Sequence, residues 1–101
     1  MPSALPEKRS SQRFRETKRF KDAARALGRQ VRQVREDRGL TLDQASALME
    51  VDLKHLQKVE AGQLNVTLVT LLRIADGLGV APGSLFGQVP QGRRRKARAV
   101  E

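Results

Sequence analysis

The side chains that carry most covalent and metal chemistry are scarce in this chain of 101 residues. It has no Cys, which excludes disulfides and thiolate metal sites, and a single histidine, His55, which excludes a metal site built from several histidines. No paired nucleophile and base and no phosphate-binding glycine loop are evident, and the segment 87–92, with Gly at both ends, is interpreted as a linker. The sequence therefore predicts no enzyme, no metal or other cofactor, and no small-molecule ligand.

The chemistry that the composition does favour is ionic. Lys and Arg number 20 against 11 Asp and Glu, which gives a formal net charge of +9 and suits nucleic acid, an acidic membrane surface or an acidic protein. Residues 1–38 carry a net charge of +7, residues 39–86 carry −2, and residues 87–101 carry +4. Arg93, Arg94 and Arg95 begin a basic run in this last segment, which either contacts the phosphates of a nucleic acid or remains a solvated tail.

The composition disfavours membranes and single-stranded nucleic acids as partners. No apolar run approaches the roughly 20 residues of a membrane span, and the first residues lack the apolar stretch of a signal peptide. With no Trp, no Tyr and three Phe, the chain offers few platforms on which single-stranded bases would stack. We expect a cytoplasmic, nucleoid-associated protein that does not bind membranes.

The spacing of apolar residues predicts helices and no strand. The first apolar stripe consists of Phe20, Ala24, Leu27, Val31 and Val34. Its steps of three and four residues predict one face of a helix that ends near Arg38, with Gly39 as its stop. Arg25, Arg29 and Arg32 fall on the other faces of this helix and are interpreted as a solvated surface.

Capping residues predict two short helices close together. Thr41 with Gln44 three residues later fits a capping box at the start of a helix over 42–49. Asp52 can cap a third helix that begins at residue 53. Gly62 can end it by adopting a left-handed conformation.

Two more helices complete the predicted domain. Thr67 caps the fourth helix, which ends at Gly79. Its inner face is predicted to consist of Leu68, Leu71, Leu72, Ala75 and Leu78. Pro82 fits the first turn of a short fifth helix. We therefore predict an all-α domain of five helices over residues 13–86, with a helix-turn-helix unit at about 41–61, between a disordered arm over 1–12 and a basic flexible tail over 87–101.

Several separated stretches carry a resemblance to a known family. Residues 27–44, LGRQVRQVREDRGLTLDQ, resemble the opening of a lambda-repressor-like (Xre/Cro-type) helix-turn-helix domain. Val59, Glu60 and Gly62, then Asn65, then residues 71–80, LLRIADGLGV, resemble its second half. The resemblance spans residues 27–86 and implies a five-helix fold with an extended first helix, and a transcriptional regulator that binds double-stranded DNA with sequence specificity.

The resemblance also implies roles for particular residues. Residues 53–60 correspond to the recognition helix, which enters the major groove and presents Leu53, Lys54, Gln57 and Lys58 to the bases. In that role Lys54 and Lys58 donate to guanine or phosphate, Gln57 pairs with adenine, and Leu53 contacts a thymine methyl group. The implied phosphate contacts are Arg35, His55, Gln63, Asn65 and Thr67. On a DNA duplex the first helix and the basic arms would add further phosphate contacts, among them Arg93, Arg94 and Arg95 of the tail. Arg35 is also implied to pair with Glu60.

The chain departs from the family at five positions. Leu42 stands where the family usually has Gln, Ala45 where a larger apolar residue is usual, Ser46 where Ala is usual, and Asp52 where Ser or Thr is common. Glu50 replaces the Gly of the turn, so it either adopts a left-handed conformation or changes the turn.

These departures support an alternative function. Leu42 and Leu53 together predict a small exposed apolar patch, of the kind that often marks a protein interface. The alternative is a helix-turn-helix fold used for protein–protein interaction, with only non-specific nucleic-acid contacts from the basic arms.

A single domain of this kind reads too few base pairs for high specificity, so a homodimer on a palindromic site is expected. The candidate dimer residues are Phe20, Val80, Leu85 and Phe86.

Overall fold

The computed structural model of the chain describes residues 13–86. Along this part of the chain lie α2 (Lys18–Asp37), α3 (Leu42–Met49), α4 (Leu53–Glu60), α5 (Leu68–Leu78) and the 3-10 helix η1 (Pro82–Phe86). A helical turn over 13–15 precedes α2, and no strand occurs within 13–86. The predicted arm over 1–12 and the predicted tail over 87–101, with Arg93, Arg94 and Arg95, lie outside the described residues.

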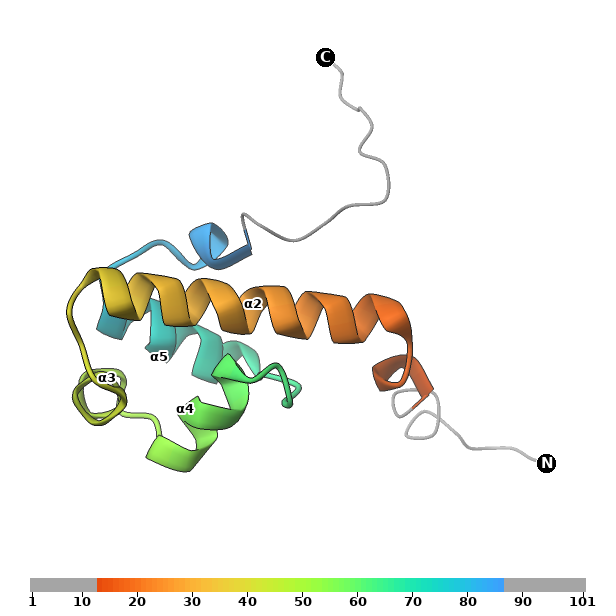
Figure 1. Cartoon of the computed structure of the whole chain (residues 1–101), viewed down its shortest axis with the longest axis horizontal. Helices are drawn as coiled ribbons and strands as arrows, with labels where there is room; N and C mark the ends of the chain where they lie inside the picture. Colours follow the sequence, from red (N-terminus) through yellow and green to blue (C-terminus); the bar gives the residue numbers. More distant parts are fainter. Residues whose placement is uncertain (1–12, 87–101) are drawn as a thin grey trace, which may run out of the picture.

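The long helix α2 organises the other elements. Figure 1 shows it running along one side of the molecule, with α4 on one flank and η1 on the opposite flank. α3 and α5 pack on each other, and α4 packs on both α2 and α3. The 20 residues of α2 are more than the small helical core needs, so its first turns extend past α4.

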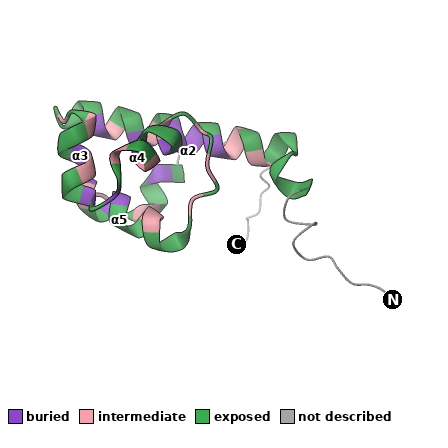
Figure 2. Cartoon of the chain, turned by 90° about the horizontal axis from the view of Figure 1, so that it is seen from below, coloured by how far each residue is buried: buried purple, intermediate pink, exposed green. Residues whose placement is uncertain are grey.

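One apolar cluster joins all these helices, and its buried residues come from each of them. They are Leu27, Val31, Ala45, Met49, Val51, Leu56, Val59, Ile74, Ala75, Leu78 and Leu85. Figure 2 shows that the buried residues face inward between the helices, while the outer faces are exposed. In α4 the buried residues are Leu56 and Val59, so its other face is left for contact with a partner.

The helix ends follow the predicted local signals. The Thr41 hydroxyl accepts from the Gln44 amide at 3.1 Å, and the Gln44 side chain accepts from the Thr41 amide at 2.9 Å, which completes a capping box. Asp52 accepts from the Lys54 amide, and Thr67 from the Thr70 amide. Each cap satisfies an amide that the helix itself leaves without a partner.

The inner face predicted for α5 is partly wrong. Leu68 and Leu72 are exposed, at 68% and 42%, while Ile74, which the prediction left out, is fully buried. Apolar residues occur on nearly every side of α5, so their spacing alone does not identify the buried face. The buried face is set by packing against α3 and η1. As a result α5 carries an exposed apolar face of Leu68, Val69 and Leu72.

The last element also differs in detail from the prediction. The fifth helix is present, but as the 3-10 helix η1. Its Leu85 is fully buried in the core, which corrects the expectation that Leu85 lies on a surface available to a second subunit. Phe86, the next residue, is 43% exposed.

Candidate nucleic-acid interface

The position of α4 is fixed by a close backbone approach to α2. A Cβ atom built on Gly28 would lie 2.6 Å from the carbonyl oxygen of Glu60 and would also overlap the carbonyl oxygen of Val59. Only a residue without a Cβ atom allows the two helices to come this close. Gly28 therefore sets how far the last turn of α4 lies from α2.

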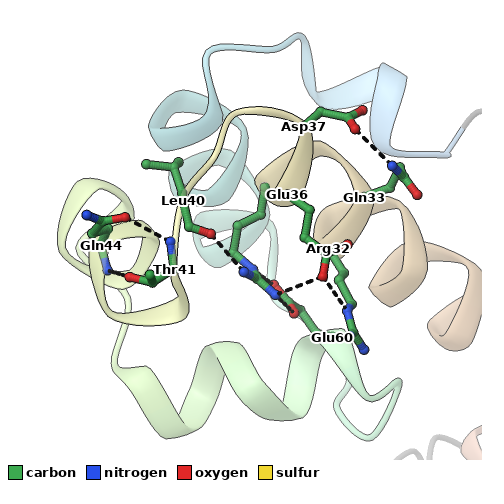
Figure 3. A network of polar contacts seen from close by, with 9 residues as sticks. Arg32, Gln33, Glu36, Asp37, Leu40, Thr41, Gln44 and Glu60 are labelled. Carbon is green, nitrogen blue, oxygen red and sulfur yellow. Dashed lines mark hydrogen bonds and ion pairs between the residues drawn. The ribbon is translucent and has the colours of Figure 1, made fainter.

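A buried ion pair holds the same end of α4. Arg35 Nε and Nη2 donate to the two carboxylate oxygens of Glu60 at 2.7 and 3.0 Å, and Arg35 Nη1 donates to the Leu40 carbonyl at 2.8 Å. The Arg35 and Glu60 side chains are only 10% and 8% exposed. The hydrogen bonds that Arg35 donates to the Glu60 carboxylate raise the pKa of Arg35 above its already high ordinary value. The guanidinium therefore joins α2, the segment before α3, and α4, as Figure 3 shows around Glu60 and Leu40.

The outer face of α4 carries polar side chains that can donate and accept hydrogen bonds. Lys54, Gln57 and Lys58 are exposed and lie at positions i, i+3 and i+4, so they share one side of the helix. Leu53 and His55 are half-buried. Among the residues implied to contact bases, the structure therefore presents Lys54, Gln57 and Lys58 together, and Leu53 less fully.

The turn between α3 and α4 keeps its usual left-handed residue although Glu50 replaces glycine there. Glu50 adopts the left-handed conformation, with φ 58° and ψ 44°, that the usual glycine would adopt more easily. Its carbonyl oxygen accepts from Arg73 Nη1 at 3.3 Å, which ties the turn to α5. The departure from glycine therefore keeps the turn and adds backbone strain.

The apolar patch predicted from Leu42 and Leu53 is not formed. Leu42 is half-buried and packs against the core, and Leu53 is also half-buried. This correction follows from the position of Leu42 at the first turn of α3, where its side chain reaches the core. The large exposed apolar side chains lie at other positions: three of them are on α5, and one, Leu48, is near the end of α3.

The segment after α4 presents three further polar side chains. Gln63, Asn65 and Thr67 are all exposed. The amide of Gln63 donates to the carbonyl of Lys58 at 2.9 Å, so it is already used to close the end of α4. The hydroxyl of Thr67 serves as the cap of α5. Gln63 and Thr67 therefore have structural roles, and the Gln63 side chain and Asn65 remain exposed for contact with a partner.

Comparison with known proteins identifies the family. A model described as a helix-turn-helix domain matches residues 26–86. The chain belongs to this helix-turn-helix family. The predicted lambda-repressor-like, all-α fold is thereby confirmed, because the structural neighbours are transcriptional regulators of the same type.

Three solved structures resemble this helix-turn-helix protein. The restriction-modification controller protein C.AhdI from Aeromonas hydrophila is 33% identical, with a TM-score of 0.61, and the match covers 62% of this chain and 96% of that one. An HTH_3 family transcriptional regulator from Vibrio cholerae is 30% identical, with a TM-score of 0.61, over 69% of this chain but only 38% of its own. The hypothetical transcription factor NHTF from Neisseria, at 22% identity and a TM-score of 0.62, covers 85% of both chains and supports the fold alone. The comparison with curated proteins gives no match.

The dimer candidates of the helix-turn-helix protein lie in different environments. Phe20 is half-buried and meets Phe14 edge to face, with ring centroids 6.5 Å apart. Val80 is half-buried against the core, and Phe86 is exposed.

No helix in the described part of the chain is long and apolar enough to cross a membrane.

The sequence prediction expects phosphate contacts from the first helix but does not identify which of its residues lie near α4. A Cβ atom built on Gly62, directly after α4, would lie 2.9 Å from the Cα atom of Arg25. This contact brings the middle of α2, with the exposed side chains of Arg25 and Arg29, beside the end of α4. The sequence prediction assigned both residues to a solvated surface, because their spacing alone does not reveal which helix lies next to them.

Proposed function

We propose that this helix-turn-helix protein is a transcriptional regulator that binds double-stranded DNA with sequence specificity. The observation that carries the proposal is the exposed face of α4, with Lys54, Gln57 and Lys58, on a helix whose far end is held by the Arg35–Glu60 pair. A helix held at one end, with donors and an amide on its free side, suits insertion into the major groove. No catalytic role is assigned to any residue.

Base recognition is assigned to the free side of α4. Lys54 and Lys58 would donate to guanine O6 and N7, Gln57 would form two hydrogen bonds with adenine, and Leu53 would contact a thymine methyl group at the rim of the interface. Each good pair of hydrogen bonds to a base is worth about 1–3 kcal/mol of discrimination.

Phosphate contacts are assigned to residues around α4, because they would fix its depth and angle in the groove. His55 is half-buried on α4, and Gln63, Asn65 and Thr67 are exposed in the segment that follows. Arg35 has all three guanidinium nitrogens engaged with Glu60 and Leu40. We therefore assign it first to positioning α4, and any phosphate contact would use its remaining N–H groups. Arg93, Arg94 and Arg95 would add sequence-independent contacts.

The proposed assembly is a homodimer on a palindromic site. Exposed apolar side chains favour such an assembly, and Phe86 remains available where Leu85 does not. Phe20 and Val80 would contribute only their exposed edges, since both are half-buried. The exposed face of α5, Leu68, Val69 and Leu72, adds apolar surface that the sequence prediction had placed in the core.

The test is to sequence the genomic fragments that the purified protein retains at near-physiological salt. We expect enrichment of a palindrome with half-sites about one helical turn apart. Lys54→Ala and Gln57→Ala should each abolish the preference at one base position, at a cost of about 1–3 kcal/mol. Arg19→Ala removes an exposed charge on α2 and should leave the preference intact. Retention of all DNA alike by the unaltered protein would contradict sequence specificity and favour the protein-interaction alternative.

A further inference from the structure

Residues 18–29 of α2 carry a basic stripe, which we define as Lys18, Lys21, Arg25 and Arg29. All four side chains are exposed. Their steps of three, four and four residues place them on one side of the helix. Residues 13–29 as a whole contain seven basic and two acidic residues, so this stripe lies in the most positive part of the described chain.

The contacts of α2 show where this side of the helix points. Gly28 packs on the last turn of α4, and Lys21 lies seven residues earlier, which is almost two full turns along the same side. Arg25, between them, lies against Gly62 at the exit from α4. The basic stripe therefore begins beside the end of α4 and continues beyond it. Figure 1 shows the same geometry: α2 projects past α4, and the turn over 13–15 bends toward the side on which α4 lies.

The cations at the two ends of α2 are used differently. In the second half Arg35 binds Glu60, and Arg32 binds Glu36 at 3.0 Å. In the stripe, Asp22 binds Lys18 at 2.8 Å and lies 3.9 Å from Arg25, while Lys21 and Arg29 form no ion pair with any residue of the described chain. The stripe therefore has positive charge that the fold itself does not neutralise.

Most of the stripe also lies outside the shared domain. The family model begins at residue 26, so Lys18, Lys21 and Arg25 precede it. The fold of the family does not need these residues. This extension of α2 adds exposed positive charge next to α4, which suggests that an anionic partner binds on that side.

We propose that the basic stripe binds the phosphate backbone of the same DNA, next to the base pairs that α4 contacts. The proposal rests on the proposed function, because it takes the free side of α4 as the DNA-facing side. From Lys18 to Arg29 the helix rises about 16 Å at roughly 1.5 Å per residue. One DNA strand presents a phosphate about every 3.4 Å along the duplex axis, so this length faces about five phosphates. The stripe thus lengthens the contacted site without reading further bases.

The experiment measures the salt dependence of DNA affinity for the full chain. Lys21→Gln and Arg29→Gln each remove one cation and keep a long side chain that covers the same surface. Each phosphate contact contributes a slope of about −0.9 to the plot of log affinity against log salt concentration. We expect each substitution to make the slope less steep by roughly 0.9 and the double variant by roughly 1.8. Affinity should fall equally for specific and random duplexes, and the enriched sequence should stay the same.

The matched control is Arg19→Gln. Arg19 is exposed on the same turns of α2 but lies about 160° around the helix from Lys21. It removes the same charge from a side that faces away from α4, and its salt slope should equal that of the unaltered protein. Circular dichroism melting should show that all three single variants fold. An unchanged slope in both stripe variants, or an equal change in Arg19→Gln, would overturn the proposal.

The outcomes also separate this proposal from the proposed function. If the unaltered protein enriches a palindrome and the stripe variants behave as the control does, the stripe alone is wrong. If DNA is retained without sequence preference while Lys21→Gln still reduces the slope, the stripe stands and specific recognition fails. Hydroxyl-radical footprinting adds a positional readout, since the stripe variants should lose protection only at the flank of the footprint. Binding of the stripe to phosphatidylserine vesicles but not to DNA would assign it to another partner and overturn the proposal.

Discussion

The two halves of α2 use the same residue types in opposite ways. In the second half, Gly28 lets α4 approach and Arg35 is consumed by a buried pair, so this half builds the domain. In the basic stripe, most of which lies in the first half, Lys21 and Arg29 are exposed and form no ion pair within the described chain. Charge on a helix therefore acquires its role from the neighbouring element and not from the helix itself.

Within the second half, the Arg32–Glu36 and Arg35–Glu60 ion pairs also differ in how much they contribute to stability. The Arg32–Glu36 pair lies at the surface, with side chains 63% and 49% exposed, and such pairs contribute about 0–1 kcal/mol. The Arg35–Glu60 pair is buried and bidentate. Removing one residue of the pair leaves the charge of the other buried without its partner. The resulting loss of stability is far larger than the net contribution of the intact pair.

The largest effect is expected from Glu60→Ala. Arg35 would remain buried with only the exposed Glu36 carboxylate, 4.0 Å from its Nη2, as a counter-charge. The free energy of unfolding in urea should therefore fall by about 3 kcal/mol, the lower end of the range for a broken buried pair. Arg32→Ala, which breaks only the exposed pair, should change it by about 0.5 kcal/mol or less. Because the pKa of Arg35 is raised, the guanidinium stays charged below its unfolded-state pKa, and its contribution is lost only on passing the folded-state pKa in strong alkali. Equal losses in the two variants would contradict the division within α2.

The next effect in size is expected from Gly28→Ala. The new Cβ atom meets the backbone of Val59 and Glu60, which cannot turn aside as a side chain can. Overpacking of this kind costs about 1–3 kcal/mol. The helix preference of Ala over Gly, roughly 1 kcal/mol, offsets part of that loss.

Urea unfolding measures the Gly28→Ala effect, with Lys21→Gln as the control in the first half of α2. Lys21→Gln should leave stability within about 0.5 kcal/mol while it alters DNA binding. A more stable Gly28→Ala variant would show that α2 and α4 are not in the close contact described here.

The sequence predicts most of the fold where the signal is local. Thr41, Asp52 and Thr67 act as caps at the predicted positions, and Gly39, Gly62 and Gly79 adopt positive φ angles at the helix ends. A cap needs only the residues within one helical turn, so a single sequence contains the whole signal. The helices of the helix-turn-helix unit were therefore placed to within a residue or two.

Prediction fails where the answer depends on which elements meet. Leu68 and Leu72 were placed inside because α5 is apolar on several sides, and only its packing on α3 and η1 decides the buried face. Glu50 left two turn conformations open, since the strain of one depends on the rest of the fold.

The candidate site divides in the same way between local and tertiary information. The face shared by Lys54, Gln57 and Lys58 follows from helical spacing. The side of α2 on which Lys21 lies acquires meaning only once α4 is placed beside Gly28.

The smallest effect is expected from Asp22→Asn, in the first half of α2. Lys18 donates to Asp22 at 2.8 Å, and this hydrogen bond, with the charges of Lys18, Arg25 and Arg29, holds the pKa of Asp22 below its ordinary value of 3.8. The stabilisation is therefore present above that value and is lost as the pH falls through the lower pKa of the folded state. Asp22→Asn should remove this small acid-dependent loss of stability.

The effect of Asp22→Asn on DNA affinity should be easier to measure than its effect on stability. Asp22 is the acidic residue between the cations of the stripe, so its neutralisation should raise affinity for specific and random duplexes alike, by less than the loss in Lys21→Gln. Glu36→Gln, an equal change of charge in the second half of α2, should have a weaker effect on affinity because Glu36 pairs with Arg32 and lies 4.0 Å from Arg35, both outside the stripe. A fall in affinity with Asp22→Asn would mean that Asp22 holds Lys18 and Arg25 in place for binding. In both halves of the helix, an acidic residue would then hold basic side chains in the positions that their roles require.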